Sequence, residues 1–176
     1  MNRGYISIGS NIDRDKHITA GLLALEQQFG KLIISSLYES EPVGFSGENF
    51  YNLVVGFDSE SDVNRVAQQL RQIEIANGRT PDSKKFSART LDLDLILYGN
   101  LIINDGKLQI PRNEIERYLF VLEPLAEIAP TLKHPVHNLS YSDLWQKMDK
   151  TNTKQRRIPY LFNSLQRIQN ISNLAK

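Results

Sequence analysis

The alternating run from Leu91 to Leu95 constrains this chain more than any other stretch. Its leucines fall on one parity, and Asp92 and Asp94 fall on the other, which is the period of a β-strand with one buried face. The two carboxylates therefore project from the same face, about 7 Å apart, where like charges repel. The sequence predicts a half-buried strand whose polar face needs a partner for two negative charges.

A hard divalent cation is one partner that suits two neighbouring carboxylates. Magnesium characteristically binds one or two carboxylates and completes its coordination with water and substrate phosphates. Arg89 stands just before the strand and could bind phosphate oxygens through its forked guanidinium. The alternative is a solvated strand face with a local arginine partner, because alternating polar faces are common in sheets. The spacing by itself leaves both interpretations open.

Size and composition narrow the class of protein. A chain of 176 residues is long enough for one domain with its own core. Its 21 basic and 20 acidic residues nearly cancel, which argues against nucleic acid as a partner. The absence of cysteine excludes disulfides, thiolate zinc sites and a cysteine nucleophile. No run of 18 apolar residues occurs, so we expect a cytoplasmic protein with no membrane partner.

The C-terminal tail differs in charge from the rest of the chain. Residues 151–176 contain five of the basic residues and none of the acidic ones. Apolar residues from Ile158 to Ile168 fall on one face of a predicted helix. We therefore expect a main domain over residues 1–150 and a basic amphipathic tail docked on it as a helix. Binding of that helix to an anionic surface is the alternative.

Hydrophobic periodicity and turn residues predict an α+β layered domain and not a doubly wound parallel sheet. A hairpin is expected to join the acidic strand to residues 101–103 through Gly99 and Asn100. The helix expected at 63–73 should begin at Ser61 or Asp62, and the helix expected at 15–29 should end at Gly30. The expected strands are 5–8, 32–38, 50–58, 91–97, 101–103 and 107–111, and the expected helices are 15–29, 63–73, 118–129 and 139–148.

Three further features could belong to a binding site. Phe50 and Asn52 share a strand face, so a ring could stack on a flat heterocycle while the amide binds its edge. An aromatic core residue beside a polar one is the alternative. The segment 40–49 concentrates Pro, Gly and Ser, which is typical of a loop able to move. The segment 79–89 carries four basic residues, which suits either polyphosphate binding or a solvated loop.

The string RTLDLDLILYG, from Arg89 to Gly99, resembles the signature of the 6-hydroxymethyl-7,8-dihydropterin pyrophosphokinases of folate biosynthesis. The strings YISIGSN, RQIEIANGR and FVLEPLAEIAP are also similar to that family. The resemblance runs from about Tyr5 to about His134 and leaves out the tail. It implies a ferredoxin-like βαββαβ core in three α/β/α layers with a mainly antiparallel sheet.

The resemblance also implies a reaction. A β,γ-pyrophosphoryl unit would pass from ATP, the co-substrate, to the hydroxymethyl group of a reduced pterin, giving AMP. Asp92 and Asp94 would bind two Mg²⁺ ions that bridge the triphosphate. Arg79 and Arg89 would neutralise the charge that develops on the transferring group. We expect a monomer acting on these two small molecules.

Other residues take roles by the same resemblance. Phe50 and Phe120 would sandwich the pterin. The positions matching the nucleotide site are Arg71, Glu74, Lys84, Lys85, Phe86, Arg89, Leu95, Lys107, Leu108, Gln109, Arg112 and Arg117. The positions matching the pterin site are Ser40, Pro42, Val43, Gly44, Phe50, Asn52, Asp92 and Phe120.

The chain departs from the family pattern around the nucleotide. Phe86 replaces a common tryptophan, and Arg112 follows Pro111 where a histidine is usual. The spacing in ERYLFVL leaves two possibilities for a family arginine: Arg117 acts from a shifted frame, or Arg112 substitutes for it. Two alternatives to the leading function are a pyrophosphokinase for another reduced pterin and a non-catalytic pterin- or nucleotide-binding paralogue.

Overall fold

The computed structural model describes residues 1–80, 88–151, 154–160 and 162. Within these ranges the strands are β1 (Asn2–Ser10), β2 (Ile33–Ile34), β3 (Leu37–Ser40), β4 (Phe50–Ser59), β5 (Asp92–Tyr98), β6 (Ile103–Asn104), β7 (Gln109–Ile110) and β8 (Arg156–Ile158). The helices are α1 (Arg14–Phe29), α2 (Val63–Ala76), α3 (Glu114–Arg117), α4 (Leu119–Ile128) and α5 (Tyr141–Lys147). No helix in the described ranges has the length and apolar character needed to cross a membrane.

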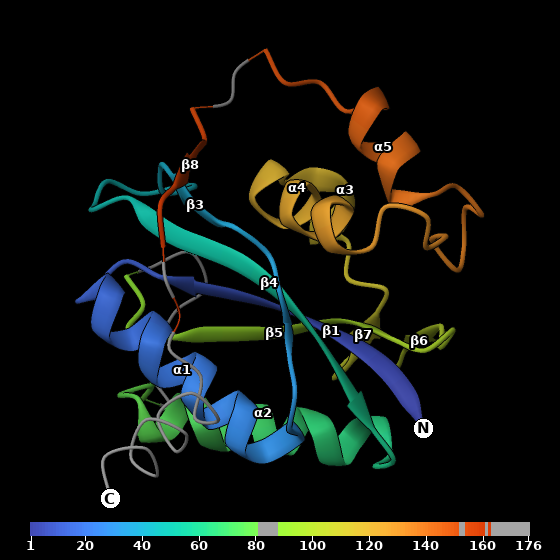
Figure 1. The fold of residues 1–176 in the computed structure, drawn as a ribbon, viewed down its shortest axis with the longest axis horizontal. Helices are drawn as coiled ribbons and strands as arrows, with labels where there is room; N and C mark the ends of the chain where they lie inside the picture. The colour runs from blue at the N-terminus through green and yellow to red at the C-terminus, as the bar shows by residue number, and fades with distance from the viewer. Residues whose placement is uncertain (81–87, 152–153, 161, 163–176) are drawn as a thin grey trace, which may run out of the picture.

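The main sheet has the strand order β5-β1-β4-β3-β8, and its pairs are antiparallel. The elements β1, α1, β3, β4, α2 and β5 follow one another in the pattern βαββαβ, with the short β2 added beside β4. Helices α1 and α2 cover one face, while α3, α4 and α5 lie on the other (Figure 1). The predicted ferredoxin-like fold in three layers is confirmed.

Each face of the sheet has its own hydrophobic core, because side chains alternate along every strand. Ile6 and Ile8 of β1 pack with α1 and α2, whereas Tyr5 belongs to the core beneath α4 and α5. In β5, Leu93 and Leu95 face the α1/α2 core, as the parity of the sequence predicts. Asp92 and Asp94 are consequently turned to the opposite face of the sheet.

A β-bulge interrupts β5 after the alternating run. Ile6 pairs with Leu95 but its neighbour Tyr5 pairs with Leu97, so Ile96 is an extra residue. Ile96 and Leu97 both join the core beneath α4. The carbonyl of Ile96 accepts a hydrogen bond from the backbone N–H of Arg112 at 3.1 Å. The bulge thereby fixes the segment that follows β7 against the acidic strand.

The predicted helix ends at Gly30 and Asp62 agree with the structure. Gly30 follows α1 with φ = 78°, and the Asp62 side chain caps α2 by accepting from the N–H of Arg65 at 3.0 Å. The single strand predicted at 32–38 is wrong, because it is divided into β2 and β3. Between them the Ser35 hydroxyl, and not a backbone carbonyl, accepts from the N–H of Val54 at 3.0 Å, which interrupts the ladder.

The predicted hairpin between the acidic strand and residues 101–103 is also wrong. After β5 the chain turns at Gly99 and leaves the main sheet, and β6 pairs with β7. The Asp105 carboxylate accepts from the N–H groups of Lys107 and Leu108 at 3.0 and 2.8 Å. This tight turn favours pairing of β6 with the next strand in the sequence over pairing with β5.

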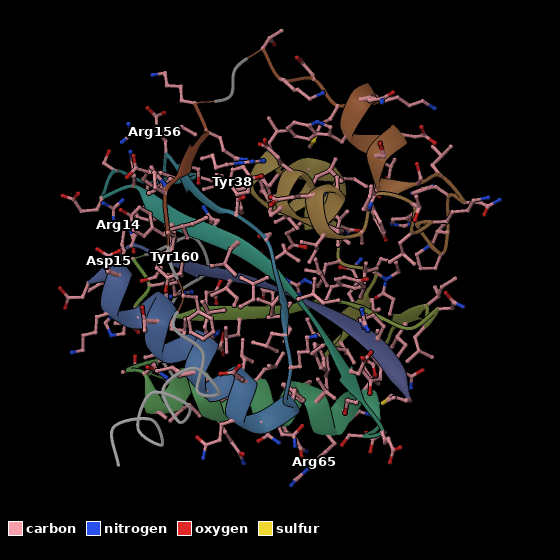
Figure 2. The ribbon with its side chains drawn as sticks, in the orientation of Figure 1. Arg14, Asp15, Tyr38, Arg65, Arg156 and Tyr160 are labelled. Carbon is pink, nitrogen blue, oxygen red and sulfur yellow. The ribbon has the colours of Figure 1, made fainter. Side chains whose placement is uncertain are left out.

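The tail also begins differently from the prediction. Residues 156–158 form β8 and not the start of a helix, because β3 offers an open edge on which they pair, with Leu37 opposite Ile158. Ile158 and Tyr160 pack against the α1/α2 core, and the Tyr160 hydroxyl lies 2.9 Å from that of Thr19 in α1. Tyr160 is labelled in Figure 2. Residues 163–176 lie outside the described residues, so the rest of the helix and the domain division stay predictions.

Candidate active site

A cavity of about 690 Å³ lies along β5, which is an edge strand of the main sheet. Residues of β1, β4, the loop after β3 and α4 line one part of it, here called the half over the sheet. Residues of α2, β5 and the segment around β7 line the other part, here called the half beyond β5. Its lining consists of Ser7, Gly9, Ser40, Glu41, Val43, Phe45, Phe50, Asn52, Ala67, Leu70, Arg71, Glu74, Arg79, Arg89, Asp92, Leu93, Asp94, Leu95, Ile96, Lys107, Leu108, Arg112, Glu114, Tyr118, Phe120 and Val121.

Asp92 and Asp94 lie where the two halves meet. On the neighbouring strand they pair with Gly9, which has no side chain, and with Ser7, whose side chain is small, so the carboxylates stay open to the cavity. Their side chains are 34% and 42% exposed, so solvent reaches them although protein surrounds them. A ligand in either half of the cavity would contact the same acidic pair.

The aspartates are held in an unfavourable electrostatic environment. Burial, followed by the charge of Glu74, raises the pKa of Asp92. Burial, followed by the charge of Asp92, raises the pKa of Asp94. The repulsion predicted from the sequence is therefore present in the fold, and a cation bound between the carboxylates would relieve it. An all-oxygen donor set open to ligand phosphates suits Mg²⁺.

Glu74 ties the aspartates to α2. It is only 4% exposed, and its Oε1 accepts from the backbone N–H of Leu93 at 2.8 Å. Its Oε2 lies 2.7 Å from Nη1 of Arg79, which is also 3.4 Å from Oδ1 of Asp92. Burial is the main cause that raises the pKa of Glu74. Glu74 thus positions both the arginine and the edge of β5.

A second guanidinium reaches the acidic pair from the segment between β7 and α3. Nη2 of Arg112 is 2.8 Å from Glu114 and 3.9 Å from Asp94. Arg112 lines the cavity, and Arg117 does not. Of the two possibilities that the ERYLFVL spacing leaves, this placement favours Arg112 as the substitute arginine.

The half of the cavity over the sheet is a slot between aromatic and amide groups. Nδ2 of Asn52 donates to Oγ of Ser40 at 2.7 Å, which orients the carboxamide. A Cβ on Gly9 would lie 3.2 Å from Oδ1 of Asn52 and 3.6 Å from the Phe50 ring, so glycine keeps the space above both open. Phe120 enters the same half from α4. The arrangement suits a flat ligand with polar edges.

The structure brings most of the predicted site residues together. Those that line the cavity are Ser40, Val43, Phe50, Asn52, Arg71, Glu74, Arg79, Arg89, Asp92, Asp94, Leu95, Lys107, Leu108, Arg112 and Phe120. Four predicted residues do not line it: Pro42, Gly44, Gln109 and Arg117. Gln109 pairs with Asn104 in the β6/β7 ribbon. Lys84, Lys85 and Phe86 lie outside the described residues.

Asn11 and Tyr118 are among the residues at or beside the cavity that the sequence analysis missed. Asn11 is buried; its Oδ1 accepts from the N–H of Arg89 at 2.7 Å, and its Nδ2 donates to the carbonyl of Glu48 at 3.2 Å. It therefore joins the segment before β5 to the loop after β3. The GSN turn at the end of β1 was the available signal. Tyr118 was also missed; its ring stacks on Phe120 at a centroid distance of 5.0 Å.

Another group of potential metal ligands lies away from the cavity. Donor atoms of Glu116, His134 and His137 fall within 4.8 Å of one another. The backbone N–H groups of Val136 and His137 point to Nδ1 of His134 at 3.2 and 3.4 Å, which assigns its proton to Nε2. Neither nitrogen of His134 then offers an available lone pair to a cation. Nε2 of His137 lies 2.9 Å from Oε1 of Glu116, so these two groups are already in contact with each other.

This chain is similar to known proteins over most of its length. Residues 5–130 match the family model of 7,8-dihydro-6-hydroxymethylpterin-pyrophosphokinase. A 2-amino-4-hydroxy-6-hydroxymethyldihydropteridine pyrophosphokinase of Haemophilus influenzae is 34% identical over 77% of this chain and 86% of its own length. The enzyme of the same name from Bacillus subtilis is 34% identical over 72% of this chain and 78% of its own.

Solved structures support the fold. A crystal structure of a Plasmodium falciparum HPPK-DHPS triple mutant with pteroate has a TM-score of 0.70 and 16% identity. The match covers 91% of this chain and 47% of that one, so this chain spans about half the length of that protein. The family match covers most of the chain and includes the acidic strand, both loops and α4. The chain therefore belongs to the 7,8-dihydro-6-hydroxymethylpterin-pyrophosphokinase family.

Proposed function

We propose that this protein transfers pyrophosphate from ATP to 6-hydroxymethyl-7,8-dihydropterin in a Mg²⁺-dependent reaction of folate biosynthesis, giving AMP and the pterin diphosphate. The observation that carries the proposal is the position of Asp92 and Asp94. The pair lies between a flat aromatic slot and a basic half-cavity, and burial raises both pKa values. Such a pair serves a reaction in which a metal-bound polyphosphate meets a planar acceptor.

The pterin is assigned to the half of the cavity over the sheet. Phe50 and Phe120 offer ring faces, and Asn52 offers a donor and an acceptor already oriented by Ser40. A fused heterocycle with alternating donors and acceptors is complementary to this set. Bound there, its hydroxymethyl group would be directed toward the aspartates.

The triphosphate is assigned to the half beyond β5. Arg79, Arg89, Arg112 and Lys107 line it, together with the apolar Leu108. These cations would neutralise the charge that develops on the transferring group and on AMP as it leaves. Asp92 and Asp94 would hold Mg²⁺, which supplies charge neutralisation and alignment of the phosphates when bound. The proposal needs no covalent intermediate on the protein.

The test is incubation of the protein with ATP, Mg²⁺ and the reduced pterin, followed by separation of the nucleotides. AMP should appear in a one-to-one ratio with the pterin diphosphate, and it should not appear without the pterin or in excess EDTA. Formation of ADP would replace the proposal with ordinary phosphoryl transfer. Absence of turnover, with pterin binding retained, would favour a non-catalytic binding protein.

We further propose that the protein acts as a cytoplasmic monomer. The support is that one chain supplies both halves of the cavity and both carboxylates. Light scattering at working concentration should give a mass near 20.1 kDa. A mass of twice that value would contradict this part of the proposal.

A further inference from the structure

The loop between β3 and β4, residues 41–49, forms one wall of the slot over the sheet. Glu41, Val43 and Phe45 from this loop line the cavity. Its two ends are adjacent, because Ser40 pairs with Phe50 where β3 meets β4. Contacts at these ends therefore control where the loop stands over the slot.

Glu39, next to the first end of the loop, is bound by two arginines from distant parts of the chain. Its Oε2 is 2.8 Å from Nη1 of Arg14 in α1. Its Oε1 accepts from Nε and Nη2 of Arg156 in β8, at 3.0 and 2.8 Å. The Glu39 side chain is 11% exposed, and that of Arg14 is 26% exposed against 73% for Arg156, so the pair with Arg14 is the better shielded of the two. Figure 2 shows the labelled Arg14 and Arg156 on the same side of the molecule.

Arg14 also binds the second end of the loop. The Nη1 atom that meets Glu39 donates to the carbonyl of Asn49 at 3.0 Å. Its guanidinium carbon lies 4.0 Å from the centre of the Tyr51 ring, which adds a cation–π contact. One guanidinium thus connects β3 at Glu39, the last residue of the loop and the strand after it.

Arg156 comes from outside the part of the chain that matches the family model, residues 5–130. It is placed by the pairing of β8 with β3, in which Arg156 lies opposite Glu39. Packing of Ile158 and Tyr160 against the core anchors the same segment. The beginning of the tail is therefore built into the support of the loop.

We propose that Arg156, Glu39 and Arg14, here called the loop clamp, are positioning residues that hold the loop 41–49 over the pterin. This inference rests on the proposed function for its substrate. A loop that is already held in place loses less conformational entropy on binding, so the clamp should act on pterin affinity and not on ATP. None of the three residues needs to contact the substrate.

The first test compares Michaelis constants for the two substrates. Arg14→Gln should raise KM for the pterin about tenfold, the effect of losing one charge-assisted hydrogen bond, and leave KM for ATP within about twofold. Arg156→Gln should raise the same constant by only about twofold, because its side chain is 73% exposed and its ion pair is screened. Arg14→Lys, which keeps the charge, should recover part of the loss.

Arg3→Gln is the matched control. Arg3 and Asp58 also form an arginine–carboxylate pair, with hydrogen bonds of 2.6 and 2.8 Å, at the opposite end of the β1/β4 ladder. Its loss should leave both Michaelis constants unchanged. The clamp is refuted if Arg14→Gln raises both constants equally, if it changes neither, or if Arg3→Gln has the same effect.

A second readout does not depend on turnover. Hydrogen exchange should be faster in peptides covering residues 41–49 of the Arg14→Gln variant, and unchanged in those of Arg3→Gln. Unchanged exchange in Arg14→Gln would refute the clamp even in an active enzyme. If the Arg14→Gln variant exchanges faster but the wild-type protein forms no AMP, the clamp is supported and the proposed function is rejected. The two failures are therefore distinguishable.

Discussion

Carboxylates on β5 and on β3, toward opposite edges of the sheet, have pKa values shifted in opposite directions. At the β5 edge, Asp92 and Asp94 lie close to Glu74, and burial raises both pKa values. On the β3 side, the Arg156 guanidinium is the main cause that lowers the pKa of Glu39, and Arg14 adds to it. At Glu39 the arginines of the protein outweigh burial, whereas at Asp92 and Asp94 burial and neighbouring carboxylates outweigh Arg79 and Arg112. A bound cation would relieve this imbalance, which is what the proposed Mg²⁺ site requires.

The largest expected effect that would break this comparison comes from Asp94→Asn. The variant keeps the shape of the side chain but removes a metal ligand, so AMP formation should fall by roughly a hundredfold or more. At neutral pH the metal-free variant should also melt at a higher temperature than the wild type, because a repulsive charge has gone. Both are measured on one preparation, by nucleotide separation and by circular dichroism.

Asp58→Asn is the control for that experiment, since Asp58 is paired with Arg3 in the same sheet but lies outside the cavity. It should leave AMP formation unchanged and should not raise the melting temperature. An Asp94→Asn variant with normal activity would remove Asp94 from the metal site.

Glu74 allows the hydrogen bond and the charge to be separated. Glu74→Ala leaves the buried N–H of Leu93 without its acceptor and should lower the free energy of unfolding by about 1–3 kcal/mol. Glu74→Gln can keep that acceptor while losing the charge that binds Arg79, so it should cost less. Urea denaturation measures both. Equal losses in the two variants would show that the ion pair, and not the hydrogen bond to β5, is the stabilising contact.

The pH dependence of stability should have opposite signs on the two sides. The native state binds more protons than the unfolded chain at Asp92 and Asp94, so their contribution to metal-free stability decreases as pH rises from about 4, the ordinary carboxylate value, toward neutrality. Glu39 has a lowered pKa, and its contribution is lost as pH falls below that ordinary value. Urea titrations at several pH values test this: Asp94→Asn should reduce the loss of stability between about pH 4 and neutrality, and Glu39→Gln should remove the contribution of Glu39 on the acid side. A slope at neutral pH that Asp94→Asn leaves intact would come from other groups.

The smallest effect is expected from Lys154→Gln. Lys154 lies 3.3 Å from Glu41, but the two side chains are 77% and 57% exposed. Such a pair should contribute less than about 0.5 kcal/mol to unfolding. A larger loss on urea denaturation would mean that β8 is held by contacts of its exposed side chains more than by its pairing with β3.

Much of the fold followed from local patterns. The alternation at Leu93 and Leu95 predicted which side of β5 is buried, and the cap residue Asp62 predicted the start of α2. The errors arose where a distant partner decides the structure. Residues 156–158 are strand because β3 offers an open edge, and nothing within the tail sequence encodes that edge. The split at Ser35 likewise depends on Val54 of another strand.

The candidate site divides in the same way. The spacing of Asp92 and Asp94, and the shared strand face of Phe50 and Asn52, made each pair a candidate, because each pair lies within one element. The resemblance to the family then chose between the alternatives that the pattern left open. Arg112 was left as one of two possibilities, since its distance from Asp94 depends on how the chain returns after β7. The roles of Arg14 and Asn11 were missed because both depend on contacts between segments that are far apart in the sequence.

Because of the bulge in β5, the number of residues in this strand affects the position of Arg112. Deletion of Ile96 or Leu97 would let β5 pair with β1 without interruption, and either remaining residue could still fill the core. It would also displace the carbonyl that receives the amide of Arg112. We therefore expect evolutionary drift here to exchange one aliphatic residue for another freely, while insertions and deletions are selected against.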